Sequence, residues 1–138
     1  MRPMPTVVDA MTPFPYTIES SEPLKSAITI MYAKSIRHLP VVQGNVLVGL
    51  LSDRDVKLAM AVSAGKAEQD NLKVDDVCIH DPYVVPHTEK LNVVLDCMVE
   101  DHIGSALVVK GGKLVGIFTV TDACRKLSEL LRLSHPDA

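Results

Sequence analysis

A hydroxyl residue is followed three positions later by an aspartate in two tetrapeptides, Ser52-Asp53-Arg54-Asp55 and Thr119-Val120-Thr121-Asp122. Each tetrapeptide ends an apolar run that is typical of a strand and precedes a pattern that is typical of a helix. A hydroxyl at a strand end can donate to a phosphate oxygen, and the N–H groups of the new helix favour an anion. The aspartate can accept hydrogen bonds from both hydroxyls of a ribose. The two tetrapeptides therefore indicate nucleotide-binding chemistry.

The same pattern has a simpler interpretation. Ser, Thr and Asp are favoured at helix N-termini because their oxygens accept hydrogen bonds from unpaired backbone N–H groups. Asp55 and Asp122 could therefore serve only as caps, and the sequence leaves both interpretations open. The carboxylate pairs Asp53/Asp55 and Asp75/Asp76 also lie at predicted helix starts, where capping explains them.

Metal-binding and catalytic motifs are not found in the sequence. Five histidines and three cysteines are present, but no pair has the spacing of a zinc site. There is no Gly-x-Ser-x-Gly, Walker loop or His-Glu-x-x-His. We interpret Cys97 as a core residue and Cys78 as an apolar contact. The sequence thus predicts neither a metal nor a catalytic site.

The elements that carry the two tetrapeptides are duplicated. With an offset of 67 residues, residues 7–55 align with residues 74–122 without a gap, and 15 of the 49 positions are identical. Such self-similarity is the signature of a repeated supersecondary unit. We therefore predict two copies in residues 1–66 and 67–138, packed on each other with pseudo-two-fold symmetry.

Each copy has the pattern of a βαββα unit, which predicts an α+β fold. Apolar residues recur at helical spacing from Leu24 and again from Leu91, with Ser21 and Thr88 as expected N-caps. Glycine between two β-branched runs predicts a hairpin in both copies. We expect second helices over 53–64 and 122–133, with Gly65 as a C-cap, and a polar linker over 63–72. The final helix carries Leu127, Leu130, Leu131 and Leu133, which we interpret mainly as its packing face.

Composition and charge argue against several classes of protein. The chain has 138 residues, is 47% hydrophobic and carries a net charge of −3. Its first 66 residues hold seven Lys/Arg against five Asp/Glu, which is too few for a duplex-binding stripe but enough for the phosphates of one small ligand. No apolar run reaches membrane-spanning length, the N-terminus does not resemble a secretory signal, and three cysteines without a C-x-x-C pair favour a reducing cytoplasm.

The segments IRHLPVVQGNVLVGLLSDRDV and IGSALVVKGGKLVGIFTVTDA resemble cystathionine-β-synthase-type (CBS) domains. The resemblance extends to the preceding proline-containing segments and covers about 120 residues. Two CBS motifs in tandem are called a Bateman module. The resemblance implies binding of an adenosyl ligand such as AMP, ADP, ATP or S-adenosylmethionine, and a sensing role rather than catalysis. It also implies a homodimer formed through helix faces.

In this family each cleft combines the Ser/Thr-x-x-Asp tail of one copy with the base pocket of the other. The resemblance thus implies a first cleft made of Thr119, Asp122, Met11, Tyr16, Thr17, Ile36, Arg37 and His38. It implies a second cleft made of Ser52, Arg54, Asp55, Cys78, Tyr83, Val84, Ile103, Gly104 and Ser105. Because Arg37 and His38 add cations to the first cleft, we expect it to prefer ATP or ADP over AMP, more strongly at low pH.

The sequence leaves several functions open. The leading interpretation is a stand-alone regulatory module for an adenine nucleotide, with any effector domain on another polypeptide. A structural dimerisation module with empty clefts is the alternative. A small enzyme and a nucleic-acid binder are weaker alternatives, because neither a nucleophile–base pair nor a basic stripe is evident.

Overall fold

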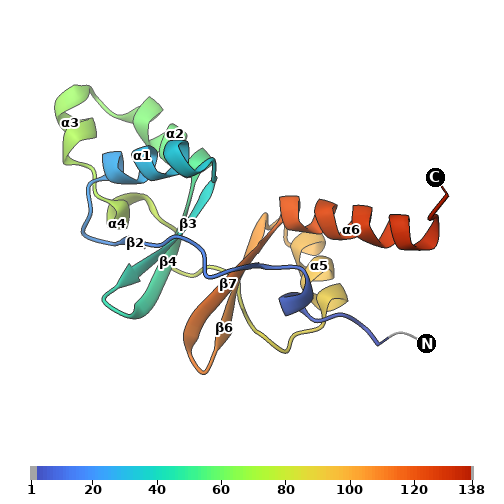
Figure 1. Cartoon of the computed structure of the whole chain (residues 1–138). Coiled ribbons are helices and arrows are strands. Elements are labelled where there is room, and N and C mark those ends of the chain that lie inside the picture. The colour runs from blue at the N-terminus through green and yellow to red at the C-terminus, as the bar shows by residue number, and fades with distance from the viewer. Residues whose placement is uncertain (1–2, 138) are drawn as a thin grey trace. The chain divides into compact units, whose positions relative to one another are not determined.

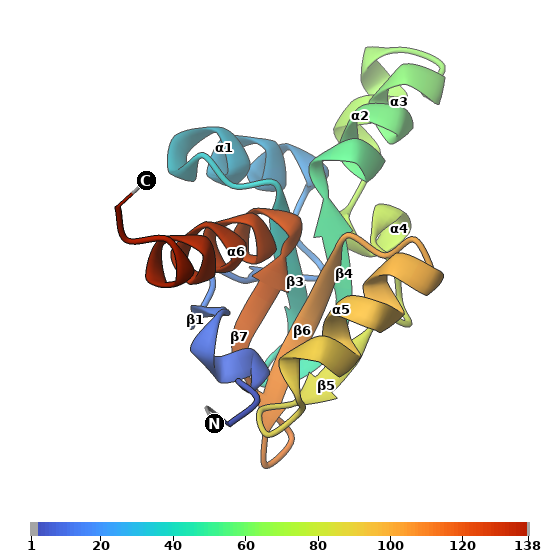
Figure 2. The same cartoon turned by 90° about the vertical axis from the view of Figure 1, so that its right-hand side faces the viewer.

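The computed structural model describes residues 3–137; the outermost residues of the predicted repeats, 1, 2 and 138, lie outside the described residues. The chain forms an α+β fold with two repeats and divides into two compact units (Figures 1 and 2). One unit contains residues 16–82. The other contains the described residues up to Pro15 together with those from Tyr83 onward. These are called the 16–82 unit and the 83–137 unit, and the second also includes the described residues up to Pro15.

The 16–82 unit contains a three-stranded sheet with strand order β2-β3-β4. Its elements are β2 (Ile18–Glu19), α1 (Leu24–Lys34), β3 (His38–Gln43), β4 (Val46–Ser52), α2 (Asp53–Val62), α3 (Lys66–Asn71) and α4 (Val74–Val77). Strand β2 is parallel to β3, and β3 is antiparallel to β4 through a turn in which Gly44 has a φ of 63°. The helices α1, α2 and α4 contact one another, and their apolar side chains cover a core around Leu24, Leu39 and Leu51.

The 83–137 unit contains a four-stranded sheet with strand order β1-β7-β6-β5. Its elements are the 3-10 helix η1 (Val7–Asp9), β1 (Thr12–Pro13), β5 (Val84–Pro86), α5 (Leu91–Glu100), β6 (Ser105–Lys110), β7 (Lys113–Thr119) and α6 (Val120–Ser134). Strand β5 is parallel to β6, β6 is antiparallel to β7, and β1 is antiparallel to β7. Val94 and Phe118 are fully buried in its core. The predicted βαββα order is thus present in both units.

The N-terminal segment of each copy packs with the hairpin of the other copy. Val7 belongs to the core of the 83–137 unit, whereas Val74, its equivalent in the repeat, belongs to the core of the 16–82 unit. Thr12 pairs with Ile117, and the equivalent residues Ile79 and Leu50 form the same antiparallel bridge. Each compact unit therefore combines the hairpin of one repeat with the N-terminal segment of the other. The division into domains at residues 66 and 67 stays a prediction.

Several local predictions from the sequence were wrong. The N-caps of α1 and α5 are Pro23 and Lys90, each two residues beyond the expected Ser21 and Thr88. Helix α2 ends at Val62, and Gly65 precedes α3 with a φ of 141° rather than capping α2. The predicted linker contains the helix α3, whose six residues bury no side chain. Its short polar sequence gives no apolar periodicity that would have predicted a helix.

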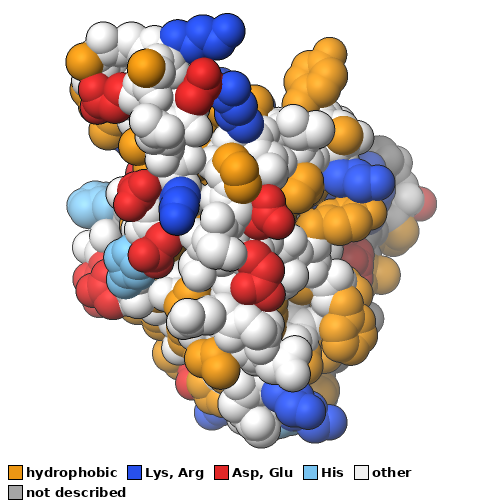
Figure 3. Space-filling model, turned by 90° about the vertical axis from the view of Figure 1, so that its left-hand side faces the viewer, with side chains coloured by type: hydrophobic (Ala, Val, Ile, Leu, Met, Phe, Trp, Pro, Cys, Tyr) orange, Lys and Arg blue, Asp and Glu red, His pale blue; other side chains and the backbone are white. Residues whose placement is uncertain are grey.

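The leucine stripe of α6 is not buried within the described residues. Leu127, Leu130, Leu131 and Leu133 are all exposed, with Leu127 at 58%. Their interpretation as a packing face of the second copy was therefore wrong. In the face drawn in Figure 3, basic side chains lie in separate places among acidic and apolar ones, rather than in a continuous stripe. Among residues 3–137, no helix combines the length and apolar character needed to cross a bilayer.

Candidate functional site

The Ser52–Asp55 turn joins β4 to α2. Ser52 is the N-cap of α2, and its Oγ accepts a hydrogen bond from the backbone N of Asp55 at 3.1 Å. The backbone N of Asp53 donates to the carbonyl oxygen of Arg37 at 2.8 Å, which fixes the turn to the start of β3. The Oδ2 atom of Asp55 is buried and has no hydrogen-bond partner among the described residues. A buried carboxylate oxygen without a donor costs about 1–3 kcal/mol or more.

The Thr119–Asp122 turn joins β7 to α6 and is fully hydrogen-bonded. Oδ2 of Asp122 accepts from the backbone N of Thr119 at 2.9 Å and from its Oγ1 at 3.1 Å. Oδ1 accepts from Oγ1 of Thr12 at 2.9 Å and from Nη1 of Arg125 at 2.8 Å. A carboxylate has about four acceptor positions, so these bonds saturate Asp122, which is only 2% exposed. Asp122 thus takes part in capping α6, and its role in ligand binding stays a prediction.

The repeat explains why the two aspartates differ. The residue equivalent to Thr12 is Ile79, and the residue equivalent to Arg125 is Leu58. Neither apolar side chain can donate a hydrogen bond. The Asp55 carboxylate therefore lacks the two side-chain donors that hold Asp122. The 67-residue alignment contains this difference, but its meaning depends on the pairing of the N-terminal segments with the hairpins.

Cationic side chains also surround the Ser52–Asp55 turn. His38 lies opposite Ser52 in the β3–β4 pairing, next to the exposed Arg37, and the exposed Arg54 is the third residue of the turn itself. Burial lowers the pKa of His38 from its usual 6.5, as does Arg37, while Asp55 and Asp53 act in the opposite direction. His38 thus gains its charge only below the pH at which an exposed histidine does. We therefore expect protonation of His38 to strengthen any preference for ATP or ADP over AMP only at a lower pH than an exposed histidine would.

The structure divides the other predicted site residues between the two units. Tyr16, Thr17, Ile36 and Cys78 belong to the 16–82 unit, with Ser52, Arg54 and Asp55. Met11, Tyr83, Val84, Ile103, Gly104 and Ser105 belong to the 83–137 unit, with Thr119 and Asp122. Ser105 is buried and lies opposite Thr119 in the β6–β7 pairing. The two predicted clefts each draw on both units and stay predictions.

Two of the predicted aromatic residues differ in environment. Tyr16 is 54% exposed, and the ammonium of Lys34 lies 5.2 Å from its ring centre. Tyr83 is half-buried, and burial together with its hydrogen bond to Cys97 raises its pKa to about 12. Tyr83 is therefore a neutral phenol at physiological pH. Either ring could stack on a base, and Tyr16 is the more exposed of the two.

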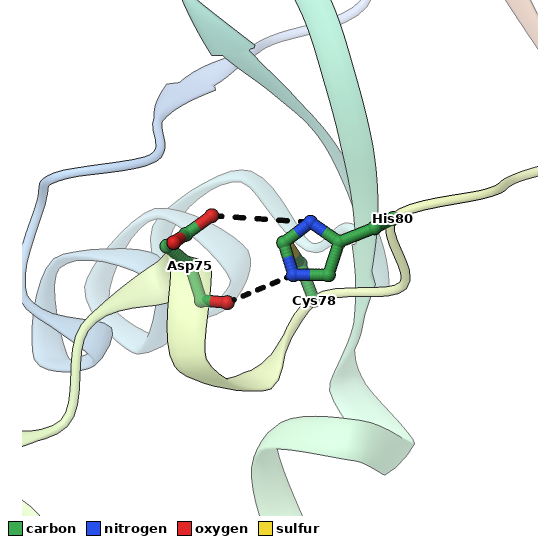
Figure 4. A group of neighbouring side chains, drawn as sticks. All are labelled: Asp75, Cys78 and His80. Atoms are coloured by element: carbon green, nitrogen blue, oxygen red, sulfur yellow. Dashed lines mark hydrogen bonds and ion pairs between the residues drawn. The ribbon is translucent and has the colours of Figure 1, made fainter.

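A group of three metal-ligating side chains was missed by the sequence analysis. Ligand atoms of Asp75, Cys78 and His80 lie within 4.8 Å of one another in the 16–82 unit (Figure 4). Cys78 is buried as predicted, against Gly49 of β4, and its pKa is raised by burial and by the nearby Asp75. The spacing 75–78–80 matches no common zinc motif, so the group becomes evident only in the folded structure.

Comparison with known proteins places the chain in a family. The model of the CBS domain matches residues 7–62 and 74–129, so the chain belongs to the CBS-domain family and contains two CBS domains. The resemblance noted from the sequence is confirmed. A crystal structure of a candidate acetoin utilization protein (AcuB) from Vibrio cholerae is 31% identical, with a TM-score of 0.85 over 99% of both chains. The fold is thus that of a CBS-domain pair.

Other relatives carry ligands or further domains. The CBS-domain pair of protein MJ0100, solved with 5-methylthioadenosine and S-adenosyl-L-methionine, is 25% identical, with a TM-score of 0.80 over 92% of this chain and 98% of that one. CBSX2, solved with AMP, is 26% identical, with a TM-score of 0.77 and the same coverage. Inosine-5'-monophosphate dehydrogenase of Thermoplasma acidophilum is 29% identical over 89% of this chain. The chain spans only 22% of that enzyme's length.

Proposed function

We propose that the chain is a regulatory module that binds an adenosyl nucleotide at the Ser52–Asp55 turn. The observation that carries the proposal is the buried Oδ2 of Asp55, which has no hydrogen-bond partner among residues 3–137. A ribose hydroxyl that donates to this carboxylate recovers the free energy lost by the unpaired oxygen. Asp122, the equivalent residue, already accepts four hydrogen bonds, so a ligand there must first displace Thr12 or Arg125.

The ligand class follows from the same turn and from the relatives. AMP and S-adenosyl-L-methionine, which two similar CBS-domain pairs hold, share an adenosine moiety. The ribose of that moiety supplies two adjacent hydroxyl donors, which suit a carboxylate acceptor. An adenosyl compound is therefore the ligand that these observations support.

Phosphate groups have suitable partners at this turn. The Ser52 hydroxyl accepts from the backbone of Asp55 and keeps its own hydrogen for donation. The ten-residue helix α2 begins here, and its dipole favours an anion. Arg37 and Arg54 are exposed and carry no ion pair among the described salt bridges. The proposal thus places phosphates at the Ser52–Asp55 turn rather than at Thr119–Asp122, which replaces the ranking expected from sequence.

The remaining predicted residues enter the proposal as base-pocket candidates. Cys78 belongs to the same unit as the turn, and its Sγ lies against Gly49 of β4, the strand that ends at Ser52. In the family arrangement, Tyr83, Val84, Ile103 and Ser105 would complete the pocket. Ile36 and Tyr16 belong to the cleft that the resemblance implies at Thr119 and Asp122. We further propose that the module acts in the cytoplasm, is not an enzyme, and signals to an effector protein.

A panel of ligands tests the proposal on the full chain. AMP, ADP, ATP, NAD and S-adenosylmethionine are added separately, and thermal unfolding is monitored. A ligand present at 100 times its dissociation constant stabilises the folded protein by about 2.7 kcal/mol, which raises the melting temperature by several degrees. Adenosine compounds should stabilise the protein, while guanosine monophosphate serves as the matched control. Absence of a shift with every adenosyl compound overturns the proposal and favours the structural alternative.

Self-association is a second proposal, and the exposed leucines of α6 favour it. Helix α6 has Leu127, Leu130 and Leu131 exposed on one amphipathic helix of fifteen residues. Exposed apolar stripes of this kind mark interaction surfaces. We propose a homodimer that buries this stripe. Sedimentation should report a dimer for the native chain and a monomer for Leu127→Glu/Leu131→Glu; a native monomer contradicts the proposal.

A further inference from the structure

Asp75, Cys78 and His80 bring three different metal-ligating atoms to one place in the 16–82 unit. The Sγ of Cys78 lies 4.0 Å from Nδ1 of His80, and that nitrogen lies 3.9 Å from Oδ1 of Asp75. In a tetrahedral zinc site, with Zn–S about 2.3 Å and Zn–N or Zn–O about 2.0 Å, these pairs are separated by about 3.3–3.5 Å. Movements of about half an ångström would therefore bring these two pairs to coordination distance, and all the ligand atoms of the group lie within 4.8 Å of one another.

The backbone orients the imidazole of His80 for coordination. Its Nε2 lies 3.1 Å from the carbonyl oxygen of Asp75, as the dashed line in Figure 4 shows. A carbonyl oxygen only accepts, so Nε2 carries the proton and donates. In this tautomer Nδ1 has a free lone pair and lies 3.9 Å from Oδ1 of Asp75, while Sγ of Cys78 lies 4.0 Å from Nδ1 and 3.9 Å from Nε2. Histidine ligands of metals are oriented by this same type of hydrogen bond from the second ring nitrogen.

The segment that carries the three residues is held in place by two elements. Asp75 belongs to α4. At the end of this helix the backbone N of Cys78 donates to the carbonyl oxygen of Val74 at 2.9 Å. The next residue, Ile79, forms reciprocal backbone hydrogen bonds of 2.8 and 2.9 Å with Leu50 of β4. The donor atoms are thus positioned by regular structure, while Asp75 and His80 stay more than half exposed and open to an entering ion.

The repeat shows that the fold does not need these side chains. Val8, Met11 and Pro13 occupy the equivalent positions in the other copy, which forms the same antiparallel bridge. None of those three is a strong metal ligand. The chemistry at Asp75, Cys78 and His80 is therefore an addition to the repeated architecture. Cys78 is shared with the pocket proposed at the Ser52–Asp55 turn, whereas Asp75 and His80 are not among the residues proposed there.

We propose that Asp75, Cys78 and His80 form a site for a divalent metal ion of the zinc class. A thiolate, an imidazole nitrogen and a carboxylate oxygen are the donors that zinc uses in proteins, and the sulfur disfavours magnesium and calcium. Three protein ligands leave a fourth position for water or for a ligand from solution. The proposal reverses the expectation from the sequence that the chain holds no metal.

Cobalt(II) substitution tests the site directly. Tag-free native protein is titrated with Co²⁺ under reducing conditions, and thiolate-to-cobalt charge-transfer absorption is recorded in the near ultraviolet. One equivalent of Co²⁺ should generate the band, and one equivalent of Zn²⁺ should remove it. Cys78→Ser should abolish the band. His80→Asn and Asp75→Asn should each weaken binding at least about tenfold, since even outer partners of a metal site contribute that much.

Matched variants separate this site from adventitious binding. Cys124→Ser removes an exposed thiol, and Asp81→Asn and His87→Asn remove a carboxylate and an imidazole that lie outside the group. These three should bind Co²⁺ like the native protein. The exposed His80→Asn keeps the test valid if Cys78→Ser fails to fold. No charge-transfer band, a band that Cys124→Ser abolishes, or affinity unaffected by His80→Asn would each overturn the proposal.

Discussion

Asp55 and Asp122 occupy the same position of the two repeats, but only Asp122 has its carboxylate fully hydrogen-bonded. Asp122 accepts from Thr12, Thr119 and Arg125, whereas Oδ2 of Asp55 is buried without a partner among the described residues. Asp122 thus stabilises its own turn, whereas Asp55, the equivalent residue, has an oxygen available to accept a hydrogen bond from a ligand. This asymmetry determines which turn we assign to the ligand.

The asymmetry predicts different stability effects for the two aspartates. Asp122→Ala removes the buried acceptor of four hydrogen bonds, so the free energy of unfolding should fall by about 2–4 kcal/mol. Asp55→Ala removes an unsatisfied oxygen and should change it by less than about 1 kcal/mol. Urea unfolding of both variants measures the difference. Equal losses for the two variants would show that Asp122 is not the structural member of the pair.

Replacing the equivalent glycines of the two hairpins by alanine should likewise reduce stability by different amounts. A Cβ at Gly49 would lie 2.6 Å from the backbone oxygen of Ile79, so Gly49→Ala must shift the bridge and should cost about 1–3 kcal/mol. A Cβ at Gly116 meets the flexible side chain of Met11, which can move, so Gly116→Ala should cost less. Gly104→Ala has open space and is the control. Thermal unfolding of the three variants gives the order, and a Gly116→Ala loss above that of Gly49→Ala contradicts it.

Acidification should destabilise the protein through His38. Its folded-state pKa is lowered by burial and by Arg37, so the unfolded chain binds the proton more readily. The contribution of neutral His38 is therefore complete above the unfolded pKa of about 6.5 and is lost as pH falls below it. His38→Asn should reduce the difference between the unfolding free energies at about pH 7.5 and about pH 5.5. An unchanged difference would show that another group carries the pH dependence.

Arginine substitutions should identify the phosphate end of the ligand. Arg37→Ala and Arg54→Ala should lower the affinity for ATP more than that for adenosine, because each removes a charge-assisted contact that only phosphate makes. The exposed Arg132 of α6 provides the matched control, since it lies on the 83–137 unit. Calorimetric titration with both ligands gives the ratio. A uniform loss for ATP and adenosine would remove the phosphate role of the substituted arginine.

The sequence predicts the repeated parts of this fold well. The 67-residue offset, the glycine hairpins and the Ser/Thr-x-x-Asp tails identify two βαββα units because each rests on local periodicity or turn chemistry. Helix α3 was missed since it has no buried face, and the α6 leucines were assigned to a core that they do not enter. Local patterns do not say which surface a helix covers.

The candidate site was predictable only in part. Ser52, Asp55 and their equivalents were found from their types and spacing. The hydrogen bond from Thr12 to Asp122 spans 110 residues, and no local rule predicts such a contact. The grouping of Asp75, Cys78 and His80 likewise depends on the turn after α4 and on the bridge to β4. Long-range pairing therefore decides which of two similar tails has a free acceptor.

Calorimetric titration of AMP and ATP into Asp55→Asn and Asp122→Asn tests the central claim most directly. Loss of a charge-assisted hydrogen bond of roughly 1.5–3 kcal/mol should weaken binding to Asp55→Asn by roughly 10–150-fold. Asp122→Asn should bind both nucleotides nearly as well as the native chain. Native-like affinity in Asp55→Asn, or a large loss confined to Asp122→Asn, would contradict the assignment of the ligand to the Ser52–Asp55 turn.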